Sequence, residues 1–340
     1  MDGEKMWQGL RKGKNWKYLA VVIVLAILCI ASLAYAVAVT EVLMSERMRN
    51  TSGTSGGENN TQNETLTVVD DMGRVVKIPQ PVSRVVSTAP SNTEILFAVG
   101  AGPLVVGVDN YSDYPDEVKN LTKVGDFVSM NVELIYSLKP DVVFAYYGQR
   151  MGIERLAELG IPVVTIRPQT IEDVMNEILL IGTICGKREN AESLVNNLTQ
   201  RIEKVVNATK DLPDTARPRV YYECWNSPYM SAGPGSFIND LIRMAGGTNI
   251  AANASKDYPI LAEEFIIQAN PQVIITSSMN MDTPEKIMQR ENWQSIEAVK
   301  QGKVYAIDDN LISRPGPRIV EGLELLAKLI HPEIFGGNFA

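Results

Sequence analysis

Apolar residues repeat at helical spacing along a polar segment near the middle of the chain. Between Lys187 and Lys210 they recur at steps of three and four residues, and the segment contains neither proline nor glycine. This pattern predicts one amphipathic helix, roughly 35 Å long from the rise per residue of an α-helix. Gly186 before it and the two prolines of DLPDTARP after it predict where the helix begins and ends.

The segments on either side of this helix resemble each other. ELIYSLKPDVVFAYY begins at Glu133 and EFIIQANPQVIITSS begins at Glu264, and the same offset of 131 residues aligns Pro140 with Pro271. Each segment reads as a short helix, a proline and a buried strand, an order that is also common in unrelated α/β proteins. The match favours two similar halves joined by the long helix.

Short apolar runs alternate with helical patterns on both sides of the helix. The first half opens with two strands around a turn at 71–73 and then alternates strand and helix, and the series restarts at Arg219. Such alternation is typical of α/β proteins with parallel sheets. We therefore predict two similar lobes, each a mainly parallel sheet flanked by helices. In the first lobe, Ser91 and Glu94 have the spacing of a capping box at the start of a helix.

An uncharged run of 23 residues, 18–40, is long enough to cross a bilayer as a helix. Basic residues precede it, so the positive-inside rule places 1–17 in the cytoplasm and the rest of the chain outside. The small-x-small triplets AYA and AVA leave cleavage by a signal peptidase as an alternative, but the length of the run favours an uncleaved single-pass anchor. Leu28 is too large for the lipoprotein cleavage box that Cys29 would need, which argues against a lipid anchor.

The pattern therefore divides the chain into six parts. They are the cytoplasmic N-terminus 1–17, the transmembrane anchor 18–40, a flexible tether 41–64, the N-terminal lobe 65–186, the interlobe helix 187–210 and the C-terminal lobe 211–340. The tether is rich in Ser, Thr, Gly and Asn and has no apolar period, as expected of a segment that cannot bury a core.

Charge, sequons and cysteines add to the predicted location and partners of the protein. The formal net charge of −8 argues against nucleic acid as a partner. N-x-S/T sequons predict an N-glycosylated cell-surface protein; they begin at Asn50, Asn59, Asn63, Asn110, Asn120, Asn197, Asn207 and Asn253. Cys185 and Cys224 could pair in an oxidising exterior, although two small buried thiols are the favoured interpretation.

Aromatic residues concentrate in the segments that follow predicted strands. Ligands of open α/β sheets bind beyond the carboxyl ends of the strands, so these rings predict a large flat or apolar ligand held by stacking, with arginines supplying charge. Any one ring could equally be packed beneath its own loop. The candidate ligand-binding residues are Tyr111, Phe127, Tyr146, Tyr147, Arg150, Trp225, Tyr229, Tyr258 and Arg314.

Residues for catalysis and for metal binding are scarce. His331 is the single histidine, and the sequence has no CxxC, no HExxH and no phosphate-binding loop. We therefore predict no enzyme, no resident metal and no cofactor, so that any metal would arrive as part of the ligand. Glu133 and Glu264 open equivalent helices of the two halves and suit docking on basic residues of a partner, or else merely complement the helix dipoles.

These motifs, taken in order, resemble the substrate-binding proteins of ABC importers for cobalamin, ferric siderophores and haem, in which one long helix joins two lobes. The resemblance covers roughly residues 66–330 and rests on RVVSTAPSNTEILFAVGAG, VVGVDNYSDYP, VGDFVSMNVELIYSLKPDVVFA and the second-lobe run YPILAEEFIIQANPQVIIT. It implies that Glu133 and Glu264 dock into arginine pockets of the membrane permease, which works with ATPase subunits.

Within that family the chain looks most like the cobalamin binders. Their aromatic grip corresponds to Tyr111, Phe127, Tyr146 and Tyr258, and the last three are Phe or Tyr where tryptophan is typical. The resemblance thus implies an extracytoplasmic receptor for cobalamin or another corrinoid, with a ferric siderophore or haem as the alternative ligand. A surface hydrolase using Glu133, Glu263 or Glu264, or a structural module of the cell envelope, are the remote alternatives.

Overall fold

The computed structural model describes residues 64–126, 128–280 and 282–336, which belong to one compact unit. Within these ranges no helix combines the length and the apolar character needed to cross a membrane. The predicted anchor 18–40 and most of the predicted tether lie outside the described residues.

The described chain opens with an antiparallel hairpin of β1 (Thr65–Val69) and β2 (Val75–Pro79). The carboxylate of Asp70 closes its turn, because it accepts hydrogen bonds from the backbone N–H groups of Met72 and Arg74 and pairs with the Arg74 guanidinium. The two predicted strands around 71–73 are therefore confirmed.

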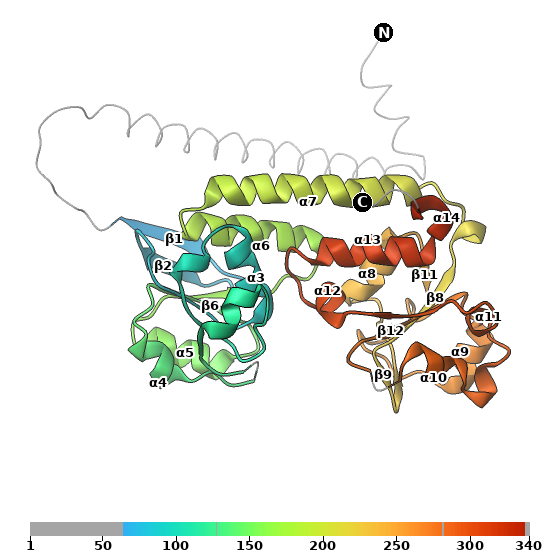
Figure 1. Ribbon diagram of the computed structural model, residues 1–340. Helices are drawn as coiled ribbons and strands as arrows, with labels where there is room; N and C mark the ends of the chain where they lie inside the picture. The colour runs from blue at the N-terminus through green and yellow to red at the C-terminus, as the bar shows by residue number, and fades with distance from the viewer. Residues whose placement is uncertain (1–63, 127, 281, 337–340) are drawn as a thin grey trace, which may run out of the picture. The chain divides into compact units, whose positions relative to one another are not determined.

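A five-stranded parallel sheet follows (Figure 1). Its order is β5 (Thr122–Lys123), β4 (Val105–Val108), β3 (Val85–Ser87), β6 (Val142–Tyr146) and β7 (Val163–Ile166). One face packs on α3 (Pro90–Ala98) and α6 (Ile171–Ile184), and the other packs on α4 (Val132–Ser137) and α5 (Arg150–Glu158). A capping box of Thr170 and Asp173 fixes the start of α6.

A second parallel sheet of four strands lies in the C-terminal half. Its order is β11 (Thr248–Asn249), β8 (Arg219–Glu223), β12 (Val273–Ser277) and β13 (Val304–Ile307). α8 (Phe237–Met244) and α13 (Ile319–Ile330) cover one face, whereas α9 (Glu263–Ala269), α10 (Pro284–Met288) and α11 (Glu297–Lys300) accompany the core of the other. The other strands and α-helices described in this half are β9 (Trp225–Asn226), β10 (Tyr229–Met230), α12 (Asp309–Ser313) and α14 (Pro332–Phe335). The predicted α/β class, with parallel sheets flanked by helices, is confirmed.

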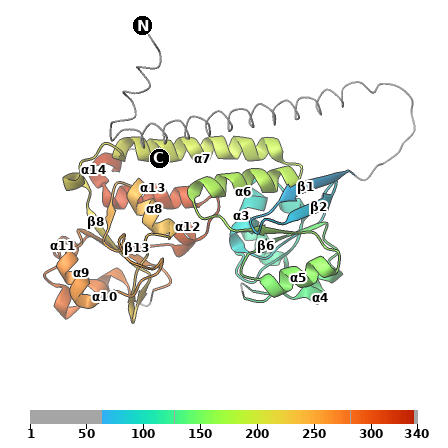
Figure 2. The same cartoon turned by 180° about the vertical axis from the view of Figure 1, so that it is seen from behind.

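The long helix α7 (Arg188–Thr209) matches the predicted helix to within a residue at each end and runs past both sheets (Figures 1 and 2). It packs against α6 at Gly182, where an added Cβ would collide with the side chain of Ala191. Toward its other end, Arg201 of α7 forms a bidentate ion pair with Glu324 of α13.

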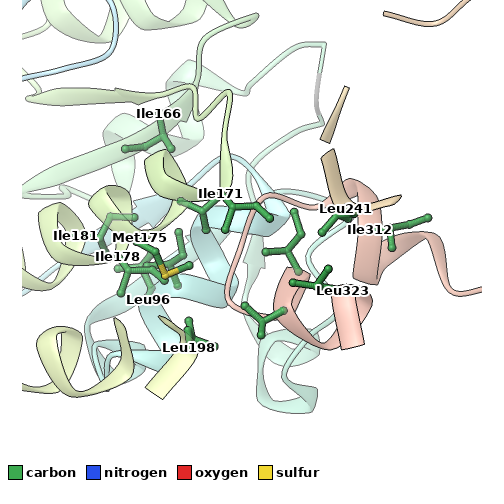
Figure 3. Packing of buried hydrophobic residues seen from close by; sticks show 14 of the residues in the cluster. Leu96, Ile166, Ile171, Met175, Ile178, Ile181, Leu198, Leu241, Ile312 and Leu323 are labelled. Carbon is green, nitrogen blue, oxygen red and sulfur yellow. The ribbon is translucent and has the colours of Figure 1, made fainter. Parts of the chain in front are cut away.

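One apolar core continues beneath α7 from the first sheet to the second (Figure 3). It includes Leu96 of α3, Ile178 of α6, Leu198 of α7, Leu241 of α8 and Leu323 of α13. Two smaller cores lie on the opposite faces of the two sheets, under α4 and α5 and under α9 to α11. The shared core explains why both halves form one compact unit.

The internal repeat is visible in the backbone. Among the described residues, the non-glycine positions with positive φ are Lys139 (48°) and Asn270 (46°), which stand 131 residues apart, one position before Pro140 and Pro271. Both follow the short helices α4 and α9 and lead into β6 and β12. The segments aligned by sequence therefore share a left-handed helix end as well as their order of elements.

One local prediction is wrong. Ser91 and Glu94 do not form a capping box, because α3 begins earlier, with Pro90 at its first turn and no side-chain cap on Ala89. Glu94 is buried and binds two arginines instead, and a carboxylate satisfied in this way is not available to the end of its helix.

The repeated left-handed positions generate a stability prediction. Lys139→Gly should raise the free energy of unfolding by up to about 1 kcal/mol, because its side chain is exposed and glycine adopts positive φ without steric cost. Asn270→Gly should lower it by about 1 kcal/mol, because Asn270 Oδ1 accepts a hydrogen bond from the Glu297 N–H at 2.8 Å. Urea unfolding of both variants checks this, and shifts of the same sign would contradict it.

Candidate functional site

A cavity of about 1030 Å³ lies at the carboxyl ends of the strands of both sheets. In the first half it is lined by segments that follow β3, β4, β6 and β7, and in the second half by the start of α8, by Tyr258 and by the segments after β12 and β13. The observed position agrees with the expectation from parallel-sheet topology.

Five of the predicted ligand-binding residues line this cavity, namely Tyr111, Tyr146, Tyr147, Tyr258 and Arg314. Trp225 lines a second cavity of about 520 Å³. The two cavities adjoin, since Tyr258, Met279, Asp309 and Ser313 line both.

Two predicted residues lie elsewhere. Arg150 begins α5 and is exposed, and its guanidinium pairs with Glu154 at 2.9 Å. Tyr229 packs its ring on Trp293, with 5.4 Å between the ring centroids, and has the Arg290 guanidinium stacked over it. Neither lines the cavity. Phe127 lies outside the described residues.

Aromatic rings form one wall of the cavity. Tyr146 and Tyr147 meet edge to face, with 4.6 Å between their centroids, and the Arg167 guanidinium lies 4.3 Å from the Tyr147 centroid. Burial raises the pKa of the Tyr146 hydroxyl above its usual range, so this phenol stays neutral at physiological pH. The wall therefore offers apolar ring faces, hydroxyl groups and the Arg167 guanidinium to a ligand.

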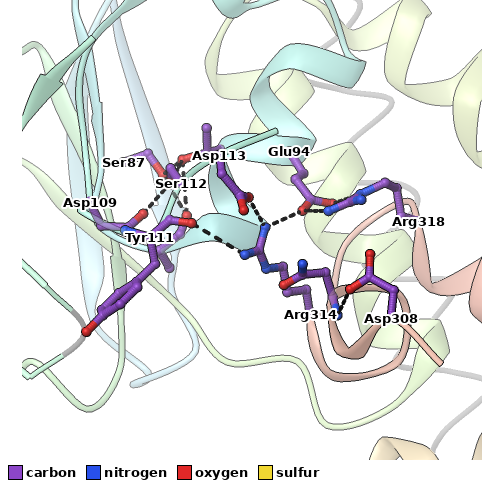
Figure 4. A network of polar contacts seen from close by, with 12 residues as sticks. Ser87, Glu94, Asp109, Tyr111, Ser112, Asp113, Asp308, Arg314 and Arg318 are labelled. Atoms are coloured by element: carbon purple, nitrogen blue, oxygen red, sulfur yellow. Dashed lines mark hydrogen bonds and ion pairs between the residues drawn. The ribbon is translucent and has the colours of Figure 1, made fainter. Parts of the chain in front are cut away.

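Ion pairs centred on the buried Glu94 carboxylate join the two halves beside the cavity (Figure 4). The Glu94 carboxylate of α3 accepts hydrogen bonds from Arg318 at 2.6 and 2.9 Å and from Arg314 at 3.1 Å. Arg314 also pairs with Asp113 at 2.7 Å. Two acidic groups of the first half thus neutralise two arginines of the second.

A network of small polar groups shapes the loop that carries Tyr111 and Asp113 (Figure 4). The buried Asp109 carboxylate accepts hydrogen bonds from the Tyr111 N–H, at 2.8 Å, and from the Ser112 hydroxyl. Burial raises the pKa of Asp109, whereas these hydrogen bonds act in the opposite direction. Ser112 continues the network to Thr93 of α3, so the loop is tied to the helix beside it.

Comparison with known proteins fits this geometry. A family model described as "Periplasmic binding protein" matches residues 85–311, which is well over half of the chain. The chain belongs to the periplasmic binding protein family.

Relatives within the family cover most of the chain. An uncharacterized ABC transporter substrate-binding lipoprotein of Bacillus subtilis is 34% identical, over 79% of this chain and 87% of its own length. A cobalamin-binding protein of Halobacterium salinarum is 32% identical, over 78% of this chain and 74% of its own length. Among solved structures, the vitamin B12 binding protein of Vibrio cholerae superposes with a TM-score of 0.64 at 25% identity, over 76% of this chain and 99% of that one.

The two carboxylates considered for docking, Glu133 and Glu264, lie on equivalent helices of the two halves. Glu133 in the first turn of α4 and Glu264 in the first turn of α9 are both exposed, and neither makes a hydrogen bond or an ion pair within the described part of the chain. Both helices lie on the side away from α7 in the two views (Figures 1 and 2). The neighbouring Glu263 differs, since it accepts a hydrogen bond from Trp293 Nε1 at 2.9 Å.

Several residues of the site escaped the sequence analysis. Arg167 directly follows β7, so the rule that picked the other loops also applies to it. Asn92 and Met279 also line the cavity. No local signal distinguishes these two from ordinary helix and loop residues.

The cysteines, the sequons and His331 can also be compared with their predicted roles. Cys185 and Cys224 are unpaired; Cys185 is buried and Cys224 is half-buried. The sequon residues at positions 110, 120, 197, 207 and 253 are exposed, and the remaining three lie outside the described residues, so glycosylation stays a prediction. His331 is buried and has the Glu333 carboxylate 2.7 Å from its Nδ1 atom, which gives it a structural place in the fold.

The buried pairs lead to a prediction with a matched control. Glu94→Ala should lower the free energy of unfolding by about 3 kcal/mol or more, because it leaves the poorly exposed guanidinium groups of Arg314 and Arg318 short of negative charge. Glu154→Ala removes the carboxylate of the exposed Arg150 pair and should cost under about 1 kcal/mol. Denaturant unfolding checks the difference, and equal costs would contradict it.

Proposed function

We propose that this periplasmic binding protein is the extracytoplasmic substrate-binding component of an ABC importer, and that it captures a metal chelate, with cobalamin or another corrinoid as the preferred ligand. The observation that carries the proposal is the ring-lined cavity of about 1030 Å³ between the carboxyl ends of two parallel sheets. Its size is at the upper end of small-molecule sites, as a macrocycle requires. The cobalamin-binding relative from Halobacterium salinarum supports the choice of ligand.

A ferric siderophore or haem is the alternative ligand. Arg167 lines the cavity, and its guanidinium has no carboxylate within ion-pair distance among the described residues, so it suits a ligand that bears carboxylates. Arg314 supports the alternative less, because Glu94 and Asp113 already neutralise its charge.

The remote alternatives receive less support. Glu133, Glu263 and Glu264 do not line either cavity, and Glu263 is engaged by Trp293, so the carboxylates named for a hydrolase do not lie where the ligand would be bound. An envelope module would have no need of a cavity with rings and arginine. Both observations favour a binding protein over an enzyme or a scaffold.

For the partner, we propose that Glu133 and Glu264 dock on basic residues of a permease that works with ATPase subunits. Their exposure, their lack of partners in the described chain and their equivalent positions on α4 and α9 support this role. The substrate-binding protein of Bacillus subtilis, itself assigned to an ABC transporter, supports the class of partner.

For the location, we propose that residues 18–40 anchor the chain in the membrane as a single span, with the ligand-binding part outside the cytoplasm. The uncharged run and the basic residues before it support this topology. The Bacillus subtilis relative is named a lipoprotein, so attachment to a membrane occurs in the family by another means.

The aromatic wall generates a binding prediction. Tyr111→Ala and Tyr258→Ala should each weaken the binding of cyanocobalamin by roughly 10-fold, or about 1.4 kcal/mol, because each removes a ring that lines the cavity. Tyr136→Ala is the matched control, since Tyr136 is an exposed tyrosine of α4 outside both cavities. Fluorescence titration of the purified full-length chain checks this. No binding of cyanocobalamin by the wild type would overturn the preferred ligand, and haem and ferric siderophores would then be titrated.

The docking role generates a separate prediction. The double variant Glu133→Lys, Glu264→Lys should keep the affinity for the ligand within about 2-fold but abolish uptake in cells, because it places like charges against a basic partner. Glu203→Lys, an exposed substitution on α7, should leave both properties unchanged. Uptake by the double variant at the wild-type rate would contradict the role.

A further inference from the structure

The amino end of α3 lies in the wall of the large cavity. Four consecutive residues, 89–92, line the cavity there, and no side chain caps the helix and no acidic residue stands in its first turn. Pro90 has no N–H, and the N–H groups of Ser91 and Asn92 come too early in the helix to find a partner within it. This end of the helix therefore presents two donors and a partial positive charge.

The side chain of Asn92 adds an independent observation. Asn92 is only 1% exposed, it lines the cavity, and neither its Nδ2 atom nor its Oδ1 atom has a hydrogen-bond partner. An amide buried without partners is costly, and more than nine in ten buried polar groups avoid it. A ligand group that accepts from Nδ2 would remove that cost.

The charges around this point favour an anion. Glu94 and Asp113 pair with Arg314 and Arg318. Asp309, the other acid that lines the cavity, accepts hydrogen bonds from the hydroxyl groups of Tyr222 and Ser277. Arg167 follows β7, two strands away from β3 in the sheet, and its guanidinium has no carboxylate within 4.0 Å in the described chain. A negative group at the helix end would therefore meet two backbone donors and an amide donor, and Arg167 lines the same cavity.

We propose that the amino end of α3 and the Asn92 amide form a subsite for an anionic oxygen group of the bound chelate, a phosphate ester or a carboxylate. The proposal rests on the proposed function, because it names which part of the guest molecule this wall of the cavity holds. The ring faces of Tyr146 and Tyr147 then hold the macrocycle, and the subsite fixes its orientation.

Pairs of probes that differ only in the anionic group test the subsite. Cobinamide phosphate and cobinamide differ by one phosphate, and hemin and its dimethyl ester differ by two carboxylates. The full-length wild type should bind the anionic member of a pair roughly 10-fold or more tightly than the neutral member. Equal affinities within the pair that binds would overturn the subsite.

Variants of Asn92 locate the effect. Asn92→Leu keeps the branched shape of the side chain without its donor, so it should reduce the preference for the anionic probe to under about 3-fold. Its melting temperature without probe should equal or exceed that of the wild type, because an unpartnered buried amide has been removed. If the leucine side chain does not fit at this position, Asn92→Ala is measured in place of Asn92→Leu. Retention of the full preference by the variant would overturn the proposal.

Asn196→Leu is the matched control, since Asn196 is an exposed asparagine on α7, and it should keep the wild-type preference. Inorganic phosphate separates the failure of the subsite from the failure of the corrinoid assignment. If neither organic pair binds, millimolar phosphate should still raise the melting temperature of the wild type more than that of Asn92→Leu. An equal rise in both proteins would overturn the subsite.

Discussion

The architecture depends on one apolar layer that both sheets share beneath α7. Leu198 of this helix belongs to the same core as Leu96 of α3 and Leu323 of α13, so neither sheet buries its inner face alone. Because the helices occupy the faces of the sheets, the polar ends of the strands are left to form a site. The cavity thus follows from parallel topology and from the way α7 spans the two halves.

The sequence predicted the parts of the fold that local pattern determines. The spacing of apolar residues identified α7, and the 131-residue offset identified the repeat, because each depends on residues that are close together in the chain or that recur in order. The capping box failed for the opposite reason. Glu94 pairs with Arg314 and Arg318, which are 220 and 224 residues further along, and one sequence gives no signal for such a contact.

The position of the site could be predicted from the sequence, but the direction of several of its side chains could not. Tyr111, Tyr146 and Tyr258 line the cavity as expected, because position near the carboxyl end of a strand is a topological property that the sequence carries. Arg150 has almost the same position, but α5 begins at that residue and its guanidinium turns to Glu154. Tyr229 lies outside the cavity, because its ring packs on Trp293, which is distant in sequence. Residues that are distant in the sequence but adjacent in the fold decide where such a side chain points, and a single sequence does not reveal those contacts.

The ion pairs of Glu94 also determine where the cavity can widen. Arg318 stands at the start of α13, and α13 packs on α7, so these contacts cross between the halves on the side of the long helix. A continuous helix and the buried Glu94 carboxylate resist separation there. If the proposed function holds, a ligand would enter and leave at the opposite rim. That rim is also the side of α4 and α9 (Figure 1). A transporter that binds both helices would therefore set the width of the cavity entrance directly, and no conformational change would have to pass through the core.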